Sequence, residues 1–362
     1  MAESSKTLRS AADLARADLV PADALPALEQ VAARYAVGIS PALTDLIDAH
    51  DPHDPIARQF VPAAAELETR PEESADPIGD DAHSPVEGIV HRYPDRVLLK
   101  PVHVCAVYCR FCFRREMVGP GKRQTLSPSA LAAALDYIRV RPAIWEVILT
   151  GGDPLVLSPR RLRAVVRELA DIPHVKVIRV HTRLPVADPE KITPSLVRAL
   201  RAEGKATYVV LHANHPRELS EAARQACARF VDAGIPMLSQ SVLLRGVNDD
   251  AATLEALMRT FVECRIKPYY LHHADLAPGT AHFRTTIAEG QALMRNLQGR
   301  VSGLCQPAYV LDIPGGYGKA PVGPCYWSAA EADGADAPAY HICDHAGTLH
   351  EYRDEAVVRG EK

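Results

Sequence analysis

Three cysteines stand close together in the stretch CAVYCRFCFRR, residues 105–115, at positions Cys105, Cys109 and Cys112. A closed structural zinc site takes four ligands and a disulfide framework takes an even number of thiols, so three clustered cysteines complete neither. Three thiolates suit a [4Fe–4S] cluster that keeps one iron open to another ligand. The alternative is a zinc site that borrows His103 or a distant side chain as its fourth ligand.

A second candidate stretch is LTGGDPL, residues 149–155, which follows an apolar run. Gly151 and Gly152 permit a close backbone approach and positive φ, and Asp153 is an acid that could hold an ammonium group. Taken alone, this pattern is also typical of an ordinary turn at the end of a strand.

A third candidate is Lys319 in the glycine-rich stretch PGGYGKAP, residues 314–321. The stretch is not a nucleotide-binding P-loop, because Ile313 replaces the first required glycine and Ala320 replaces the Ser/Thr. A lysine on a flexible loop suits a Schiff base, provided that its surroundings lower its pKa. Local sequence alone equally fits a solvated surface lysine.

Apolar, β-branched runs precede these stretches, and most of them begin about 30 residues apart, the length of one βα unit. The runs are DRVLLKPVHV, WEVILTGG, HVKVIRVHT, ATYVVLHA, PMLSQSVLL and IKPYYLHHAD, and a seventh is AYVLDIP. Between them, Ser127, Ser158 and Thr193 each precede a proline and predict the start of a helix. The alternation predicts a parallel sheet covered by helices, either an incomplete barrel or an open doubly wound sheet, with chemistry at the carboxyl ends of the strands.

Composition limits the class of protein. The formal net charge of −4, without a basic stripe or tail, gives no reason to expect nucleic-acid binding. No stretch approaches the ~18 apolar residues of a membrane span, and the N-terminus lacks the apolar core of a signal peptide, so we expect a cytoplasmic protein without a membrane partner. Eight cysteines are too few for a disulfide scaffold, and only three of them are clustered.

Five segments, in this order, resemble the lysine 2,3-aminomutase family: PVEGIVHRYPDRVLLK, CAVYCRFCFRR, SQSVLLRGVND, KPYYLHHADLAPGTAHFRT and VLDIPGGYGKAPV. The resemblance implies an α/β fold, a partial (β/α)6-type barrel of the radical S-adenosylmethionine (SAM) type. We expect a helical and irregular N-terminal arm over residues 1–85 and the barrel over residues 86–305. A C-terminal segment over residues 306–362 would carry the lysine loop and bind pyridoxal 5′-phosphate (PLP).

The resemblance also implies a role for each candidate residue. The three clustered cysteines would hold the [4Fe–4S] cluster, whose open iron chelates SAM, and Lys319 would bind PLP covalently. Arginine forks suit phosphate oxygens. The implied contacts to PLP are Arg92, Tyr93 and Arg96, and the implied contacts to SAM are Gly151, Gly152, Asp153, His212 and Gln240.

Substrate recognition follows from charge in the same way. By resemblance, Arg114 binds the substrate carboxylate, and Asp275 and Asp312 hold a distant ε-ammonium group. Two carboxylates around a buried ammonium are energetically sensible, whereas either one left unpaired would be costly. Family members that act on glutamate are not expected to keep both acids.

The predicted function is therefore that of a radical SAM, PLP-dependent isomerase, a lysine 2,3-aminomutase that interconverts L-α-lysine and L-β-lysine. It needs an external one-electron reductant such as flavodoxin or ferredoxin, and we expect a homo-oligomer. One alternative is the branch that makes (R)-β-lysine for elongation factor P, and another is a 2,3-aminomutase for a different amino acid. A non-radical PLP enzyme would leave the cysteines unexplained, and a zinc-binding module would leave Lys319 and the paired aspartates unexplained.

Three positions depart from the family pattern. Some members carry a zinc site between subunits, but Asp250 stands at the position of one of its cysteines and the tail contains only Cys343. We therefore predict no such zinc. His272 stands where many aminomutases have a tyrosine near PLP, which favours the elongation factor P branch, whereas the intact VLDIPGGYGK segment favours the enzymes that act on free lysine.

Overall fold

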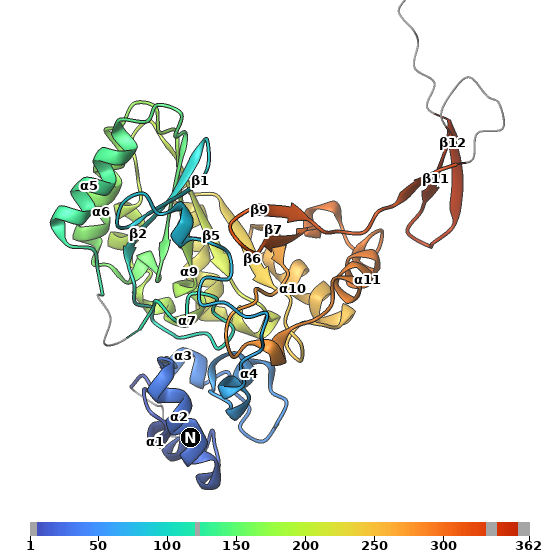
Figure 1. Cartoon of the computed structure of the whole chain (residues 1–362), viewed down its shortest axis with the longest axis horizontal. Coiled ribbons are helices and arrows are strands. Elements are labelled where there is room, and N and C mark those ends of the chain that lie inside the picture. Colours follow the sequence, from blue (N-terminus) through green and yellow to red (C-terminus); the bar gives the residue numbers. More distant parts are fainter. Residues whose placement is uncertain (1–5, 120–123, 331–338, 354–362) are drawn as a thin grey trace, which may run out of the picture.

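A single nine-stranded sheet forms the centre of the molecule in the computed structural model, which describes residues 6–119, 124–330 and 339–353 (Figure 1). Its strands follow one another in chain order from β1 to β9. The strands β2 to β8 run parallel, and β1 and β9 are antiparallel to their neighbours at the two edges. Their bounds are β1 Ile89–Tyr93, β2 Arg96–Val102, β3 Glu146–Gly151, β4 Val177–Thr182, β5 Ala206–His212, β6 Met237–Val242, β7 Ile266–His272, β8 Ala308–Ile313 and β9 Gly318–Pro321.

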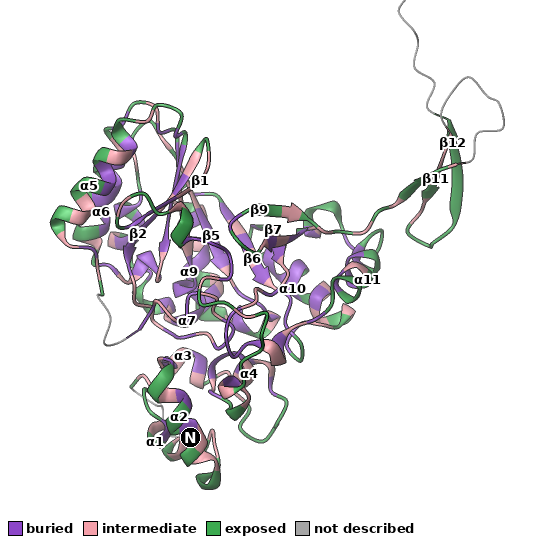
Figure 2. Cartoon of the chain, in the orientation of Figure 1, coloured by how far each residue is buried: buried purple, intermediate pink, exposed green. Residues whose placement is uncertain are grey.

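Helices connect the parallel strands and cover the outside of the sheet. They are α5 Pro128–Arg139, α6 Pro159–Ala170, α7 Leu184–Ala187, α8 Pro194–Ala199, α9 Glu221–Asp232, α10 Ala251–Glu263 and α11 Ile287–Leu297. The predicted caps are confirmed, because Ser127, Ser158 and Thr193 each accept a backbone hydrogen bond at the start of α5, α6 and α8. One continuous apolar core joins residues of the sheet and of the helices, and the strands of the barrel are largely buried in Figure 2.

The sheet curls until its two edges approach each other. The Tyr93 hydroxyl on β1 accepts a hydrogen bond from the backbone N–H of Lys319 on β9 at 2.7 Å. Arg92 on β1 also lies 3.8 Å from a carboxylate oxygen of Asp312 on β8. The expected partial barrel is confirmed, with β8 as the predicted seventh strand, and its interior collects side chains from both edges.

The N-terminal arm is helical and then irregular. Its helices are α1 Ala11–Arg16, α2 Leu25–Arg34, α3 Pro41–Thr44 and α4 Pro55–Phe60, and they share a small apolar core with Val107 of the cysteine loop. Short 3₁₀ turns punctuate the arm and the barrel loops: η1 Ala22–Ala24, η2 Ala64–Leu67, η3 Asp81–His83, η4 Pro154–Val156, η5 Pro189–Lys191, η6 Pro216–Glu218, η7 Ala281–Phe283 and η8 Gly303–Cys305. The arm packs below the barrel in Figure 1.

The C-terminal segment forms a second sheet that the sequence did not indicate. The strands β10 (Trp327–Ala329), β11 (Ala339–Cys343) and β12 (Leu349–Arg353) are antiparallel and stand away from the barrel in Figure 1. In the described ranges, no helix is both long and apolar enough to cross a membrane.

Candidate active site

The cysteine loop directly follows β2, the first parallel strand of the barrel. The arm holds its backbone, because Tyr108 N–H donates to the carbonyl of Gly38 at 3.0 Å and Arg110 N–H donates to that of Gln59 at 2.8 Å. One small cavity is lined by all three candidate ligands, Cys105, Cys109 and Cys112. The three thiols therefore share one cavity, which the arm residues Tyr35 and Ala36 also line.

Burial disfavours the thiolate form of these side chains while no metal ion is bound. It raises the pKa of all three, that of Cys109 to about 11 despite the nearby guanidinium of Arg183, whose Nη1 lies 3.5 Å from the sulfur. Metal binding must therefore displace the protons. Three thiols on one short loop, beside a cation, are a donor set that fits an iron–sulfur cluster.

A buried carboxylate from the arm anchors this loop. Glu66 is fully buried and accepts hydrogen bonds from Arg110 Nε at 2.9 Å and from Arg115. Removing one partner of a buried ion pair typically costs about 3–5 kcal/mol. The sequence carried no signal for Glu66, because it lies in the short 3₁₀ turn η2, far from the cysteines in the chain. Its contacts make Arg115 an anchor of the loop, whereas the preceding Arg114 pairs with a different arm residue, Asp80.

The GGD stretch ends β3 next to the cysteine loop. A side chain at Gly151, where φ is +103°, would come within 2.6 Å of the Val102 carbonyl, and one at Gly152 within 2.3 Å of the Val104 carbonyl. Only glycine allows the strand end to lie this close to the cysteine loop. Asp153 is buried and accepts hydrogen bonds from its surroundings, namely Leu155 N, Thr182 Oγ1 and Arg183 N. Its carboxylate thus ties β3 to β4, and a contact to SAM stays a prediction.

Two further predicted SAM contacts lie at the ends of neighbouring strands. His212 on β5 is aligned with Gln240 on β6 in the parallel register. Gln240 Nε2 lies 3.3 Å from Nδ1 of His181 on β4, a residue that sequence reasoning missed. Burial lowers the pKa of both histidines well below the usual range, so their rings are neutral. The Nε2 atoms of both rings are buried without a hydrogen-bond partner, which fits an interior that receives a polar ligand.

Lys319 pairs with Asp312 across the β8–β9 hairpin. Its Nζ lies 2.7 and 2.5 Å from the two carboxylate oxygens, and Nδ1 of His272 lies 3.6 Å from the same carboxylate. Burial opposes ionisation of Asp312, but the neighbouring His272 and the Lys319 ammonium outweigh it and hold the pKa of Asp312 well below its usual range. Lys319, predicted to bind PLP, and Asp312, predicted to bind the substrate ammonium group, are therefore in direct contact.

The HRYPDR stretch supports the lysine loop from the opposite edge strand. Besides holding the backbone of Lys319, Tyr93 stacks under the guanidinium of Arg96, which lies 3.8 Å above the ring centroid. Arg96 also pairs with Asp95 at 2.7 Å. This part of the predicted PLP site is thus assembled next to the lysine.

The two other predicted anion-binding arginines meet on one carboxylate of the arm. Asp80 is 2% exposed and lies 3.1 Å from Nη2 of Arg92 and 2.8 Å from Nη2 of Arg114. Lys100 on β2 adds a third buried cation, and its pKa is lowered by burial and by the neighbouring Arg114. Neither Asp80 nor Lys100 was singled out from the sequence, although a lysine within an apolar strand is a visible signal.

Asp275 completes the set of interior charges. Burial, followed by the neighbouring Asp312 carboxylate, raises its pKa to about 7, while Lys319 and Arg114 pull it in the opposite direction. Across the described ranges the structure gives the Asp275 carboxylate no hydrogen bond or ion pair. The three predicted substrate residues therefore lie within electrostatic range of one another, and one of the two acids has no cation of its own.

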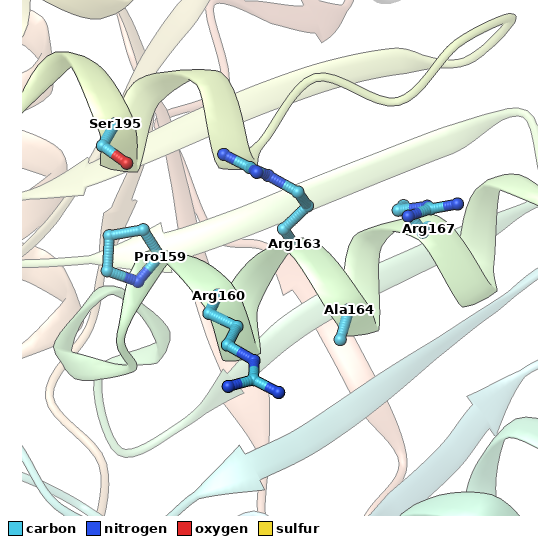
Figure 3. Close-up of a pocket in the computed structure, with 6 residues that line it drawn as sticks. All are labelled: Pro159, Arg160, Arg163, Ala164, Arg167 and Ser195. Carbon is cyan, nitrogen blue, oxygen red and sulfur yellow. The ribbon is translucent and has the colours of Figure 1, made fainter.

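A solvent-facing hollow of about 370 Å³ lies elsewhere, on the outside of the barrel (Figure 3). It is lined by Pro159, Arg160, Arg163, Ala164, Arg167 and Ser195 of α6 and α8. It contains none of the candidate residues, so we place the chemistry in the barrel interior.

Comparison with known proteins identifies the family of this chain. The Radical SAM superfamily matches residues 99–257, which include the cysteine loop and the GGD stretch. The L-lysine 2,3-aminomutase of Clostridium subterminale is 42% identical over 290 residues, 80% of this chain and 69% of that protein. The L-lysine 2,3-aminomutase of Escherichia coli is 36% identical over 80% of this chain and 83% of its own length. The glutamate 2,3-aminomutase of Clostridioides difficile is 36% identical over 83% of this chain and 70% of its own length.

A parallel barrel with three clustered cysteines after its first strand, together with the superfamily match, defines a radical SAM enzyme that uses a [4Fe–4S] cluster and SAM. Within that class, the chain belongs to the lysine 2,3-aminomutase family, which comprises PLP-dependent isomerases. The family resemblance noted in the sequence is thereby confirmed.

Proposed function

We propose that this enzyme interconverts L-lysine and β-lysine by moving the amino group between C2 and C3. The observation that carries the proposal is the pair of interior carboxylates. Asp312 already binds a primary alkylammonium group, that of Lys319, which is the same group that ends a lysine side chain. Asp275 has no cation partner among the described residues, and it lies within electrostatic range of both Asp312 and Lys319. Together they suit one substrate ammonium.

Arg114 would bind the other end of the substrate. It is 9% exposed, and its charge acts on Asp275 as well as on Asp80. A guanidinium fork matches a carboxylate in two-point contact. A substrate with a carboxylate at one end and an ammonium at the other can thus be oriented by opposite charges, which binds lysine and disfavours glutamate.

Lys319 would hold PLP, and its attachment also prepares the substrate site. A lysine that is bonded covalently through Nζ no longer offers an ammonium to Asp312. The Asp312 carboxylate would then be left without its partner inside the protein, a costly state that a substrate ammonium relieves. Asp312 would thus pair with Lys319 in the protein without PLP and with the substrate ammonium group in the substrate complex.

The remaining cofactor contacts are proposed by position. The cluster ligands are Cys105, Cys109 and Cys112, and the SAM contacts are Gly151, Gly152, Asp153, His212 and Gln240. The phosphate of PLP would meet Arg92, Tyr93 and Arg96. When bound, the cluster and SAM supply the radical and PLP supplies an electron-delocalising ring, whereas the barrel supplies orientation and excludes water.

The cellular setting belongs to the same proposal. The cluster would receive its electron from a flavodoxin or ferredoxin, the protein would act as a homo-oligomer, and it would reside in the cytoplasm. An enzyme that makes (R)-β-lysine for elongation factor P would perform the same isomerisation with the opposite product configuration. Chiral analysis of the product separates these two roles.

The test is an anaerobic assay of the reconstituted, reduced enzyme with SAM, PLP and either L-lysine or L-glutamate. We expect β-lysine from lysine and no β-glutamate. Asp275→Asn and Asp312→Asn should each lower kcat/KM for lysine by roughly 30-fold or more, because truncating one partner of a buried charge pair costs about 2–5 kcal/mol. Both variants should retain iron. Turnover of glutamate, or variants with wild-type activity on lysine, would contradict the proposal.

A further inference from the structure

Residues 76–84, here called the arm loop, are the part of the N-terminal arm that enters the candidate active site. The loop is held in one shape by its own hydrogen bonds. The two carboxylate oxygens of Asp76 accept from the backbone N–H groups of Asp80 and Asp81, each at 2.8 Å, and the Ser84 hydroxyl donates to the Asp80 carbonyl at 2.8 Å. Asp80 is therefore presented on a preformed turn.

The arm loop is in backbone contact with the lysine loop. Gly79 has φ +68°, and a side chain there would come within 2.5 Å of the Gly316 nitrogen. Nε2 of His83 lies 3.1 Å from the Gly316 carbonyl. Because Gly316 is three residues before Lys319, the position of the arm loop influences the position of the lysine.

Asp80 divides its two oxygens between two arginines. Its Oδ1 lies 3.1 Å from Nη2 of Arg92, and its Oδ2 lies 2.8 Å from Nη2 and 3.3 Å from Nε of Arg114. In the described part of the chain, Nη1 of Arg114 makes no hydrogen bond, and Nη1 of Arg92 has only a longer ionic contact, 3.8 Å from Oδ1 of Asp312. Two buried guanidinium groups would otherwise repel each other, so the carboxylate lets both converge on one interior.

We propose that Asp80 is a positioning residue that aims Arg92 at the PLP phosphate and Arg114 at the substrate carboxylate, while the arm loop around it holds the lysine loop in place. This inference rests on the proposed function. The N-terminal arm would thereby hold Arg92 of β1, Arg114 of the cysteine loop and Lys319 of β9 in fixed positions relative to one another. An asparagine at this position has one acceptor oxygen, so it can serve only one of the two arginines, and its amide group faces the donors of the other.

The first test compares Asp80→Asn with the matched control Asp81→Asn, which removes the same charge from the next, exposed residue. PLP affinity is measured by absorbance titration of the anaerobic protein, and lysine KM and kcat are measured in the reduced enzyme. We expect Asp80→Asn to raise both the PLP dissociation constant and the lysine KM by roughly tenfold or more, the size of one lost charge-assisted contact, with a smaller change in kcat. Asp81→Asn should leave both constants within about twofold of wild type. Asp80→Asn constants equal to those of Asp81→Asn would overturn the proposal.

Asp80→Glu provides a second variant in case Asp80→Asn does not fold. It keeps the charge but lengthens the side chain, so both constants should rise less than in Asp80→Asn and more than in Asp81→Asn. If Asp80→Asn cannot be purified, an Asp80→Glu variant whose PLP dissociation constant and lysine KM equal those of Asp81→Asn would overturn the proposal.

The second test needs no turnover. Hydrogen–deuterium exchange of the protein without PLP should become faster in peptides covering residues 314–321 when His83→Ala removes the contact to Gly316, and should stay unchanged in Asp81→Asn. Unchanged exchange in His83→Ala would show that the arm loop does not hold the lysine loop. A wild-type protein that binds PLP but leaves lysine unchanged would refute the proposed function. The PLP titration of Asp80→Asn and the hydrogen–deuterium exchange of His83→Ala would still test the role of the arm loop in that case.

Discussion

The protonation of Asp275 should control how the enzyme binds lysine near neutral pH. Burial and the Asp312 carboxylate raise its pKa to about 7 in the unliganded protein, but a substrate ammonium needs the ionised carboxylate. For such a group, the ionised fraction falls from about nine-tenths at pH 8 to about one-tenth at pH 6. Once Lys319 is bonded to PLP, its ammonium no longer favours the ionised form of Asp275, which raises the pKa further. We therefore expect the apparent lysine KM to rise by about tenfold or more between pH 8 and pH 6. The effect on kcat should be small, because the bound ammonium keeps Asp275 ionised in the complex.

The assay is steady-state kinetics at saturating SAM and PLP across this pH range. In Asp275→Asn the lysine KM should already be high at pH 8 and should not depend on pH. Stability gives an independent check on the same group. The folded-state pKa lies above the ordinary value of 3.8, so the folded protein holds an extra proton between about pH 4 and pH 7 and loses stability as pH rises through that window. Asp275→Asn should therefore be stabilised relative to wild type at pH 8 and not at pH 4. A wild-type KM that stays constant from pH 8 to pH 6, or an Asn variant that keeps the dependence, would refute this reasoning.

Two further substitutions test other parts of the site. Lys319→Ala should abolish turnover and let PLP be removed by gel filtration, because the covalent attachment is lost; retention of tightly bound PLP would show that another residue anchors it. Glu66→Gln should lower the free energy of unfolding by about 3–5 kcal/mol in chemical denaturation, because Arg110 and Arg115 lose a buried carboxylate. The same variant should retain less iron per chain, and a stability equal to that of wild type would contradict the anchoring role.

Much of the barrel could be predicted because its signals are local. Each β-branched run became a strand, and each Ser-Pro or Thr-Pro start became a capped helix. Parallel strands end on one face, so residues after β2, β3, β5, β6 and β7 were expected to converge. The structure does bring Asp275, Asp312 and Arg114 within electrostatic range of one another.

Contacts between residues that are far apart in the sequence could not be predicted, because no local sequence pattern marks them. Glu66 and Asp80 lie in short turns of the arm, yet each one binds two arginines from other parts of the fold. The pairing of Lys319 with Asp312 depends on the register of the β8–β9 hairpin. The C-terminal sheet was missed because its strands are short and polar.

One measurement tests the central claim most directly. The reduced enzyme, with SAM and PLP, is given L-lysine labelled with ¹⁵N at the α-amino group, and the product is examined by NMR and mass spectrometry. The account predicts β-lysine that carries the label on C3 and retains an unlabelled ε-amino group, since the α-nitrogen migrates within one molecule. Absence of β-lysine, or loss of the label from the product, would contradict it.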